Sequence, residues 1–294
     1  MSVDVKRILD ATRKRKLTTL SLVAPASVIM IGVGAFAFLW AVYFSFWPMQ
    51  GNLWSPGFSL EHYRTLLASP GILSIFLKTL GKVLLLATIT TAMAFPIAWY
   101  GGQKLSGRAG ALFILVAIAP FWTNYIVRTW AWMLMLGDNG FVNEVLTTLG
   151  LVAEPVGLLF TEFAVIVTMV YIYLPYALFA MYGSVDAIPR AQIEAAYDLG
   201  SNRYEVFRHV IVPLAMPGIV LSFVFIFARA IGAYVTPELV GSPRTLWYGN
   251  VLVNQFKNNF NWPLGAAYSV VLLGFVLVVL ALISRRLTLR KVMI

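Results

Sequence analysis

Long apolar runs alternate with short polar segments along the whole chain. Six of these runs are mostly apolar and have more than twenty residues each. A helix of about twenty apolar residues crosses the hydrocarbon core of a bilayer. The pattern therefore predicts an all-α polytopic membrane protein with six transmembrane helices, at Leu20–Trp47, Ile72–Tyr100, Ala109–Leu136, Glu162–Gly183, Met216–Leu239 and Pro263–Ile283.

The basic residues between these spans predict how the chain is oriented. Fifteen Lys and Arg fall in segments 1–17, 101–108, 188–217 and 285–294, whereas the other three connecting segments hold three. Because Lys and Arg accumulate on the cytoplasmic side, both termini are expected there. The expected organisation is a basic tail (1–17), a first helix with an outer loop (18–71), a core of five transmembrane helices (72–284) and a cytoplasmic tail (285–294).

Composition narrows the class of protein. The chain of 294 residues is 60% hydrophobic and only 12% charged, about half the charged fraction of a soluble domain. The net charge of +10 follows the membrane topology. The expected partner of the basic residues is therefore the lipid bilayer, and nucleic acid is not an expected partner. The sequence has no cysteine for a thiolate metal site, and no phosphate-binding loop of the form GxxxxGK[ST]. We expect no metal site and no ATP site on this chain.

The polar segment 188–217, which we call the elbow, predicts two short helices joined by a tight turn. Pro189 suits a first helical turn, and Gly200 suits a left-handed position after the helix end. Asn202 and Glu205 have the spacing of a capping box for the second helix. Two prolines are expected to close the segment. The apolar residues expected on one side of the first helix are Ala191, Ile193, Ala195, Ala196 and Leu199.

The elbow also carries a resemblance to a known family. Glu194-Ala195-Ala196, then Gly200, Val210, Val212 and Pro213, resemble the EAA loop of ABC importer permeases, with Val in place of the usual Ile and Leu. The resemblance implies the type I importer permease fold in a bacterial inner membrane. It also implies a second permease subunit, two ATPase subunits that bind ATP and Mg²⁺, and a periplasmic solute-binding protein. The implied ATPase-coupling residues are Glu194, Ala195, Ala196, Gly200 and Pro213. A surface helix that only covers the bundle is the alternative.

A second motif predicts a broken helix in the third span. Pro120 frees a backbone carbonyl, and Thr123 or Asn124 can bond to freed groups or to water in a cavity. A simple kink between packed helices is the alternative. The run PFWTN, with EAAYDLG and NWPLGAA (Asn261–Ala267), resembles the spermidine/putrescine-type permeases. That resemblance implies a pathway for a cationic solute at the interface with the second permease.

Charged residues within the predicted spans are candidates for function, because each is costly at membrane depth. Lys78 is expected to reach the outer interface, whereas Lys82 lies deeper. Arg128 is expected to form a salt bridge, for example to Glu238, or to contact solute. Arg229 has the same two alternatives. The candidate residues of the translocation path are Trp122, Asn124, Arg128, Tyr173 and Glu238.

The solute stays open between two chemical classes. Glu238 suits a polyamine, whereas Lys78 and Lys82 would repel one if they lined the pathway. An opine, an amino-acid derivative or a phosphonate is therefore an alternative solute. An ion-coupled secondary transporter ranks lower, since neither an internal repeat nor an acidic residue near a span centre is evident. An intramembrane enzyme is disfavoured, since the sequence lacks Cys, HExxH and paired carboxylates at membrane depth.

Overall fold

The computed structural model describes residues 2–51, 53–105 and 107–292, and these residues are mostly helical. Five helices in the described residues are long and apolar enough to cross a membrane, or six if one bent pair forms a single span. The fold class predicted from the apolar pattern is therefore confirmed.

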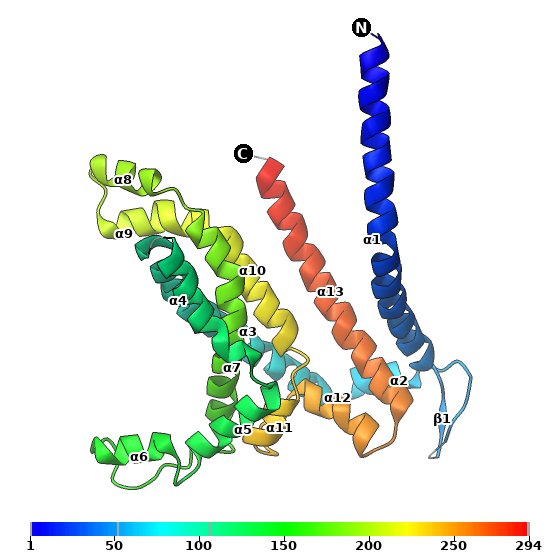
Figure 1. Cartoon of the computed structure of the whole chain (residues 1–294). Coiled ribbons are helices and arrows are strands. Elements are labelled where there is room, and N and C mark those ends of the chain that lie inside the picture. Colours follow the sequence, from blue (N-terminus) through cyan, green and yellow to red (C-terminus); the bar gives the residue numbers. More distant parts are fainter. Residues whose placement is uncertain (1, 52, 106, 293–294) are drawn as a thin grey trace.

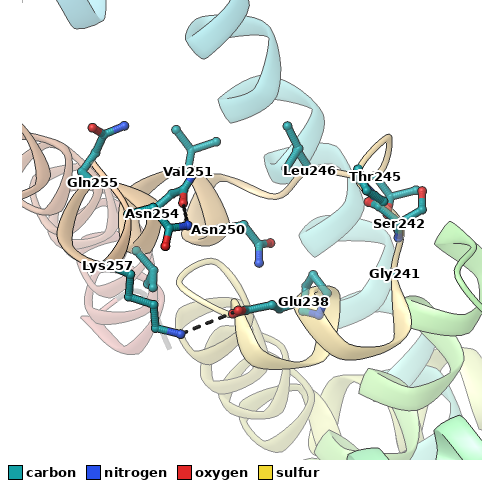
Figure 2. A pocket seen from close by; sticks show the side chains of 14 residues that line it. Glu238, Gly241, Ser242, Thr245, Leu246, Asn250, Val251, Asn254, Gln255 and Lys257 are labelled. Atoms are coloured by element: carbon teal, nitrogen blue, oxygen red, sulfur yellow. Dashed lines mark hydrogen bonds and ion pairs between the residues drawn. The ribbon is translucent and has the colours of Figure 1, made fainter. Parts of the chain in front are cut away.

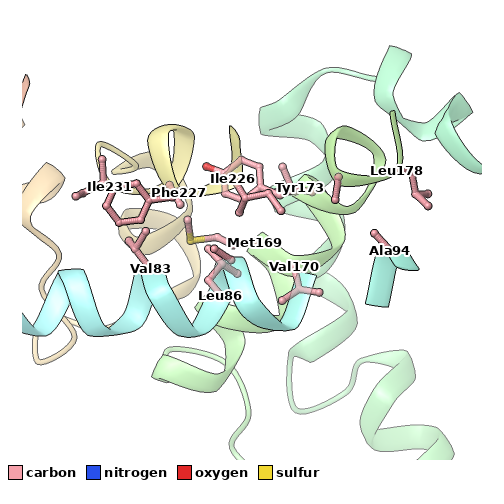
Figure 3. Packing of buried hydrophobic residues seen from close by; sticks show 14 of the residues in the cluster. Val83, Leu86, Ala94, Met169, Val170, Tyr173, Leu178, Ile226, Phe227 and Ile231 are labelled. Atoms are coloured by element: carbon pink, nitrogen blue, oxygen red, sulfur yellow. The ribbon is translucent and has the colours of Figure 1, made fainter. Parts of the chain in front are cut away.

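Three helices form the centre of the bundle, α3 (Pro70–Trp99), α7 (Glu162–Asp186) and α10 (Val212–Ala230). Their facing sides are buried, and Figure 3 shows Leu86, Met169 and Ile226 packed together between them. Several of the buried residues are alanines, and small side chains let helices in a membrane approach closely.

Two long helices flank this centre, α1 (Ser2–Phe44) and α13 (Trp262–Val292). Within α1, residues Val23–Phe44 form the apolar span, and most of its described side chains are exposed. Figure 1 shows α1 standing apart from the centre and approaching α13 near its lower end. The start of α1 and the end of α13 point toward the same end of the molecule as α8 and α9. Which side of the membrane this end faces stays a prediction.

The third predicted span, Ala109–Leu136, is broken rather than continuous. Helix α4 (Arg108–Ile118) leads into the 3₁₀ turn η2 (Ala119–Trp122), and α5 (Tyr125–Leu136) follows. The first half is residues 108–122, and the second half runs from α5 through α6 (Phe141–Thr148). The angle between the two halves is 89°. Pro120 provides the cause, because a proline removes one helical hydrogen bond and clashes with the preceding turn. The predicted break is therefore present.

The fifth span begins and ends earlier than predicted. The prediction that Pro213 and Pro217 close the elbow was wrong, because the chain stays helical from Arg203 to Ala230. The π-helical turn η3 (Phe207–Ile211) precedes Pro213, and such a turn realigns the backbone hydrogen bonds where a proline lacks its N–H. The span does not reach Leu239, because α10 ends at Ala230 and the following residues 231–234, which include the poor helix former Gly232, are not helical. A separate short helix, α11 (Val235–Val240), follows instead.

The segments predicted as outer loops contain regular structure. The first holds the small hairpin of β1 (Met49–Gln50) and β2 (Leu53–Trp54), followed by α2 (Glu61–Ala68). The second holds α6, and the third holds α12 (Tyr248–Lys257). The buried side chain of Asn143 organises the second loop, because its amide donates to the carbonyls of Gly137 and Val156 and accepts from the Val156 N–H. The predicted inner loop 101–108 begins as a π-helical extension of α3, η1 (Tyr100–Lys104).

Candidate functional site

The elbow has the two-helix form that its sequence predicts, although Pro189 lies just before the first helix and not in its first turn. Helix α8 (Arg190–Asp198) starts after Pro189, which occupies the N-cap position. Gly200 has a φ of 86°, a left-handed conformation that strains any residue with a Cβ. The capping box of α9 (Arg203–Val206) is complete. The Asn202 side chain accepts from the N–H groups of Tyr204 and Glu205, and the Glu205 carboxylate accepts from the Asn202 N–H.

The exposed surface of the elbow differs from the predicted helix face. Ile193 and Ala196 pack toward the core, whereas Ala195 and Leu199 are exposed, the latter at 87% of its surface. Helix α8 has only nine residues, and it contacts the bundle through a single turn. That turn covers only two of its apolar side chains, Ile193 and Ala196. Glu194 is exposed beside them. The elbow therefore presents a mixed apolar and acidic surface at its end of the bundle.

A buried glutamine that the sequence analysis did not single out fixes the elbow to the bundle. The side-chain amide of Gln103 donates to the carbonyls of Val185 and Ile188, at 2.7 and 3.1 Å. Arg190 in turn donates to the Gln103 carbonyl, at 2.9 Å. These bonds join η1, the end of α7 and the start of α8. A lone Gln beside two glycines gives no local signal of this long-range role.

The residues around the break in the third span lie in different environments. Trp122 ends η2 with 77% of its surface exposed. Asn124 is the N-cap of α5 and accepts from the Ile126 N–H at 2.8 Å. Arg128 is 6% exposed, and its Nε and Nη1 atoms have no hydrogen-bond partner among the described residues. The predicted Arg128–Glu238 salt bridge was wrong, because the Glu238 carboxylate lies beside Lys257.

Aromatic and hydroxyl groups connect this break to its neighbouring helices. The Tyr125 hydroxyl is 2.6 Å from the hydroxyl of Thr236 on α11. Tyr173 is buried on α7, next to Tyr176. The guanidinium of Arg229 lies over the Tyr176 ring, 5.0 Å from its centroid. Arg229 thus has a cation–π contact, where a salt bridge or solute contact was the expectation.

Lys82 has a carboxylate partner inside the protein. Its ammonium is 2.7 Å from the carboxylate of Glu162, the first residue of α7, and 5.3 Å from the centre of the Trp247 ring. The two charged side chains are only 21% and 35% exposed. Lys78 is exposed on the same helix. The pairing neutralises Lys82, so its charge does not oppose a cationic solute.

A pocket lies at the end of the bundle opposite the elbow, between α11 and α12 (Figures 1 and 2). Its volume is about 320 Å³, within the usual range for small-molecule sites. Glu238 and Lys257 are its only charged lining residues among the described ones, and their ionic groups are 3.7 Å apart. The other polar lining residues are Ser242, Thr245, Asn250, Asn254, Gln255 and Asn258.

The α12 wall of the pocket is held rigidly. The Tyr248 N–H donates to the Thr79 hydroxyl, and the Tyr248 hydroxyl donates to the Tyr268 carbonyl at 3.1 Å. Burial raises the pKa of Tyr248, so its phenol stays protonated and keeps this bond. A Cβ at Gly249 would overlap the Ala233 carbonyl, so only glycine allows this approach of α12. No group of three or more metal-ligand side chains occurs within the described ranges.

The apolar bundle, the exposed elbow and the broken span define a membrane permease component. The chain belongs to the family described as binding-protein-dependent transport system inner membrane component, whose sequence profile matches residues 70–293. It is therefore a permease subunit of an ABC importer and a multi-pass inner membrane protein. This family membership rules out the ion-coupled secondary transporter that the sequence analysis ranked lower.

Individual relatives agree with this membership. The spermidine/putrescine transport system permease protein PotB of Escherichia coli (strain K12) is 34% identical over 215 residues, which cover 73% of this chain and 78% of that protein. The inner membrane ABC transporter permease protein YdcU of the same organism is 29% identical over 84% of this chain and 82% of its own length.

A solved structure supports the fold. It is a chain of a bacterial ABC transporter involved in the import of the acidic polysaccharide alginate. The match has a TM-score of 0.70 and covers 95% of this chain and 99% of that one, at 18% sequence identity. The helical permease fold expected from the EAA resemblance is confirmed.

Proposed function

We propose that this chain forms, with a second permease subunit, the membrane pathway of an ATP-driven importer for a polyamine of the spermidine/putrescine type. Two ATPase subunits hydrolyse ATP on the elbow side, and a periplasmic binding protein delivers the solute at the pocket side. The chain itself binds no ATP or other cofactor. The similarity to a spermidine/putrescine permease over 73% of the chain carries this proposal.

The charge arrangement at the outer end supports a cationic solute. Lys82 is neutralised by Glu162, which removes one charge that spoke against a polyamine. Glu238 lines the outer pocket and is half exposed, so a carboxylate is accessible where a delivered cation would arrive. Carboxylates and aromatic faces are the groups that bind ammonium ions.

One observation favours the second candidate, a solute with a carboxylate or phosphonate group, such as an opine or an amino-acid derivative. The buried guanidinium of Arg128 has two nitrogens without a partner in the part of the chain that the structure describes. A guanidinium binds carboxylates and phosphonates through paired hydrogen bonds.

The proposed pathway runs along the broken span and α11. Trp122 and Glu238 are accessible for direct solute contact, whereas Asn124 shapes the break as the α5 cap. Tyr173 is buried within the single chain and supports this surface from behind, together with Arg128. The second permease completes the pathway on its open side.

The proposed coupling site is the exposed surface of α8 and its turn. Glu194 provides the polar contact with the ATPase subunit, and Ala195 allows its close approach. Ala196 packs α8 against the bundle and so holds this surface in place. Gly200 and the hydrogen bonds of Gln103 keep α8 fixed on the bundle, so displacement of the elbow moves α7 and α3 with it. Pro213, beside the π-helical turn, stiffens the connection to α10.

Uptake into vesicles with ATP inside tests both parts of this function. The complete complex is expected to import labelled spermidine or putrescine, and preference for an anionic amino-acid derivative would favour the second candidate. Glu194→Lys is expected to abolish uptake and loosen the ATPase subunit in a pull-down assay. Glu154→Lys, an exposed charge reversal at the opposite end, is the matched control and should leave ATPase binding intact. Normal uptake in Glu194→Lys would contradict the coupling role.

A further inference from the structure

The outer pocket already contains an ammonium group that belongs to the protein. The Lys257 Nζ atom lies 3.7 Å from the Glu238 carboxylate and 5.6 Å from the centre of the Tyr234 ring. Figure 2 shows the Lys257 side chain extending across the pocket from α12 toward Glu238 on α11. A lysine side chain is a primary ammonium on a four-carbon alkyl chain, the same group that ends an alkyl diamine. The carboxylate and the aromatic ring therefore bind the chemical group that a polyamine would present.

The same pocket has an unused hydrogen-bond acceptor. The Asn250 side-chain nitrogen donates to the Tyr234 carbonyl at 3.0 Å, which fixes the orientation of the amide. Its Oδ1 atom is then buried without a partner among the described residues, although Asn250 lines the pocket. Burying an acceptor without a donor is costly. A ligand N–H group would remove that cost.

We propose that the pocket between α11 and α12 is an entry subsite for one ammonium group of an alkyl polyamine, and that Lys257 is a tethered occupant which the solute displaces. The inference rests on the polyamine function proposed above and names the residues of its outer subsite. The carboxylate of Glu238 and the ring of Tyr234 bind the ammonium, and the Asn250 carbonyl oxygen accepts a further N–H.

The strength of the Lys257 contact fits a displaceable occupant. The two side chains are 56% and 51% exposed, and their separation of 3.7 Å is long for a charge-assisted hydrogen bond. Exposed ion pairs of this kind contribute little. The Lys82–Glu162 pair, at 2.7 Å and less exposed, has the shorter and more protected geometry of a permanent contact. Because Lys257 competes for the subsite, it lowers the affinity for the solute and limits how long the solute is retained there.

Equilibrium binding of putrescine to the purified complex of both permeases and both ATPases tests this inference. The binding protein is left out because it has its own solute site. Lys257→Met keeps an unbranched apolar side chain of similar length and removes the charge. It is expected to tighten binding about two- to fivefold, the factor that matches loss of an exposed ion pair. Glu238→Gln is expected to weaken binding, and the double variant should bind as weakly as Glu238→Gln alone. Arg244→Met, on the same connecting segment but outside the pocket lining, is the matched control and should change nothing.

The outcomes separate this inference from the proposed function. Unchanged or weaker binding in Lys257→Met, or an equal gain in Arg244→Met, overturns the tethered-occupant role. The tethered-occupant role is also overturned if the double variant keeps the tighter binding of Lys257→Met. The gain in affinity must depend on Glu238, because Glu238 is the group that Lys257 occupies. If the wild-type complex with its binding protein imports putrescine while these binding results fail, only the subsite is wrong. If it imports no polyamine at all, the proposed function itself fails.

Discussion

The ion pair between Lys82 and Glu162 is expected to stabilise the packing of α3 against α7. At 2.7 Å, the direct attraction is about 6 kcal/mol at an effective dielectric constant of about 20. Desolvation of both ions offsets most of it, at several kcal/mol per ion for full burial. The side chains here are partly exposed, at 21% and 35%, so the pair lies between a surface pair and a buried one. We expect a net coupling of about 1–2 kcal/mol, between the values of those two classes.

A double-mutant cycle isolates this coupling. Glu162→Gln leaves the Lys82 ammonium half-buried without its partner, and it also removes an acidic group from the first turn of α7, worth about 0.3–1 kcal/mol. Lys82→Met removes the pair and the contact with the Trp247 ring, worth about 0.5–1 kcal/mol. Each single variant is therefore expected to lose about 2 kcal/mol of unfolding free energy, and the double variant about 2–3 kcal/mol, which is the sum of the single losses minus the coupling. The contributions of the helix terminus and the ring cancel in the cycle.

Denaturation of the purified permease by SDS in mixed micelles, followed by circular dichroism, measures the unfolding free energies. Additive losses, within about 0.5 kcal/mol, would refute a direct interaction between the two side chains. Uptake provides a second readout. If Lys82 is structural, Lys82→Met leaves the half-saturating solute concentration unchanged, whereas a shift in that concentration would place Lys82 in the pathway.

Two further predictions follow from the elbow and the orientation of the chain. Gly200→Val is expected to cost about 1–2 kcal/mol locally, because a β-branched residue is strained at a φ of 86°. It should reduce ATPase binding and uptake. Asn tolerates a left-handed conformation better than Val does, so Gly200→Asn should retain most of both activities. Equal losses in the two variants would contradict a role for backbone strain at Gly200. Cysteines placed singly at the exposed positions Asp198 and Asn259 should react with an impermeant thiol reagent from inside and from outside the cell, respectively. Labelling of Asp198→Cys from outside would disprove the predicted orientation.

Local sequence was sufficient for the features that depend on neighbouring residues. Apolar run length predicted the spans, because a helix satisfies its backbone within the membrane without help from distant residues. The caps at Gly200 and Asn202 were predictable because each depends on residues one to three positions away. Pro120 predicted the break in the third span for the same reason. The spacing of the EAA residues with Gly200 and Pro213 was specific enough to predict the family.

The features that join distant segments were decided by the tertiary structure. Glu162 lies eighty positions from Lys82, and nothing in the apolar pattern indicates that the start of α7 meets the middle of α3. The expected partner of Glu238 was Arg128, but the break before α11 directs Glu238 toward α12 and Lys257. The prolines of α10 were expected to close the elbow, and only the π-helical turn before them explains why the helix continues. In a membrane bundle, helices form independently of one another, whereas the contacts of their polar side chains depend on how the helices pack.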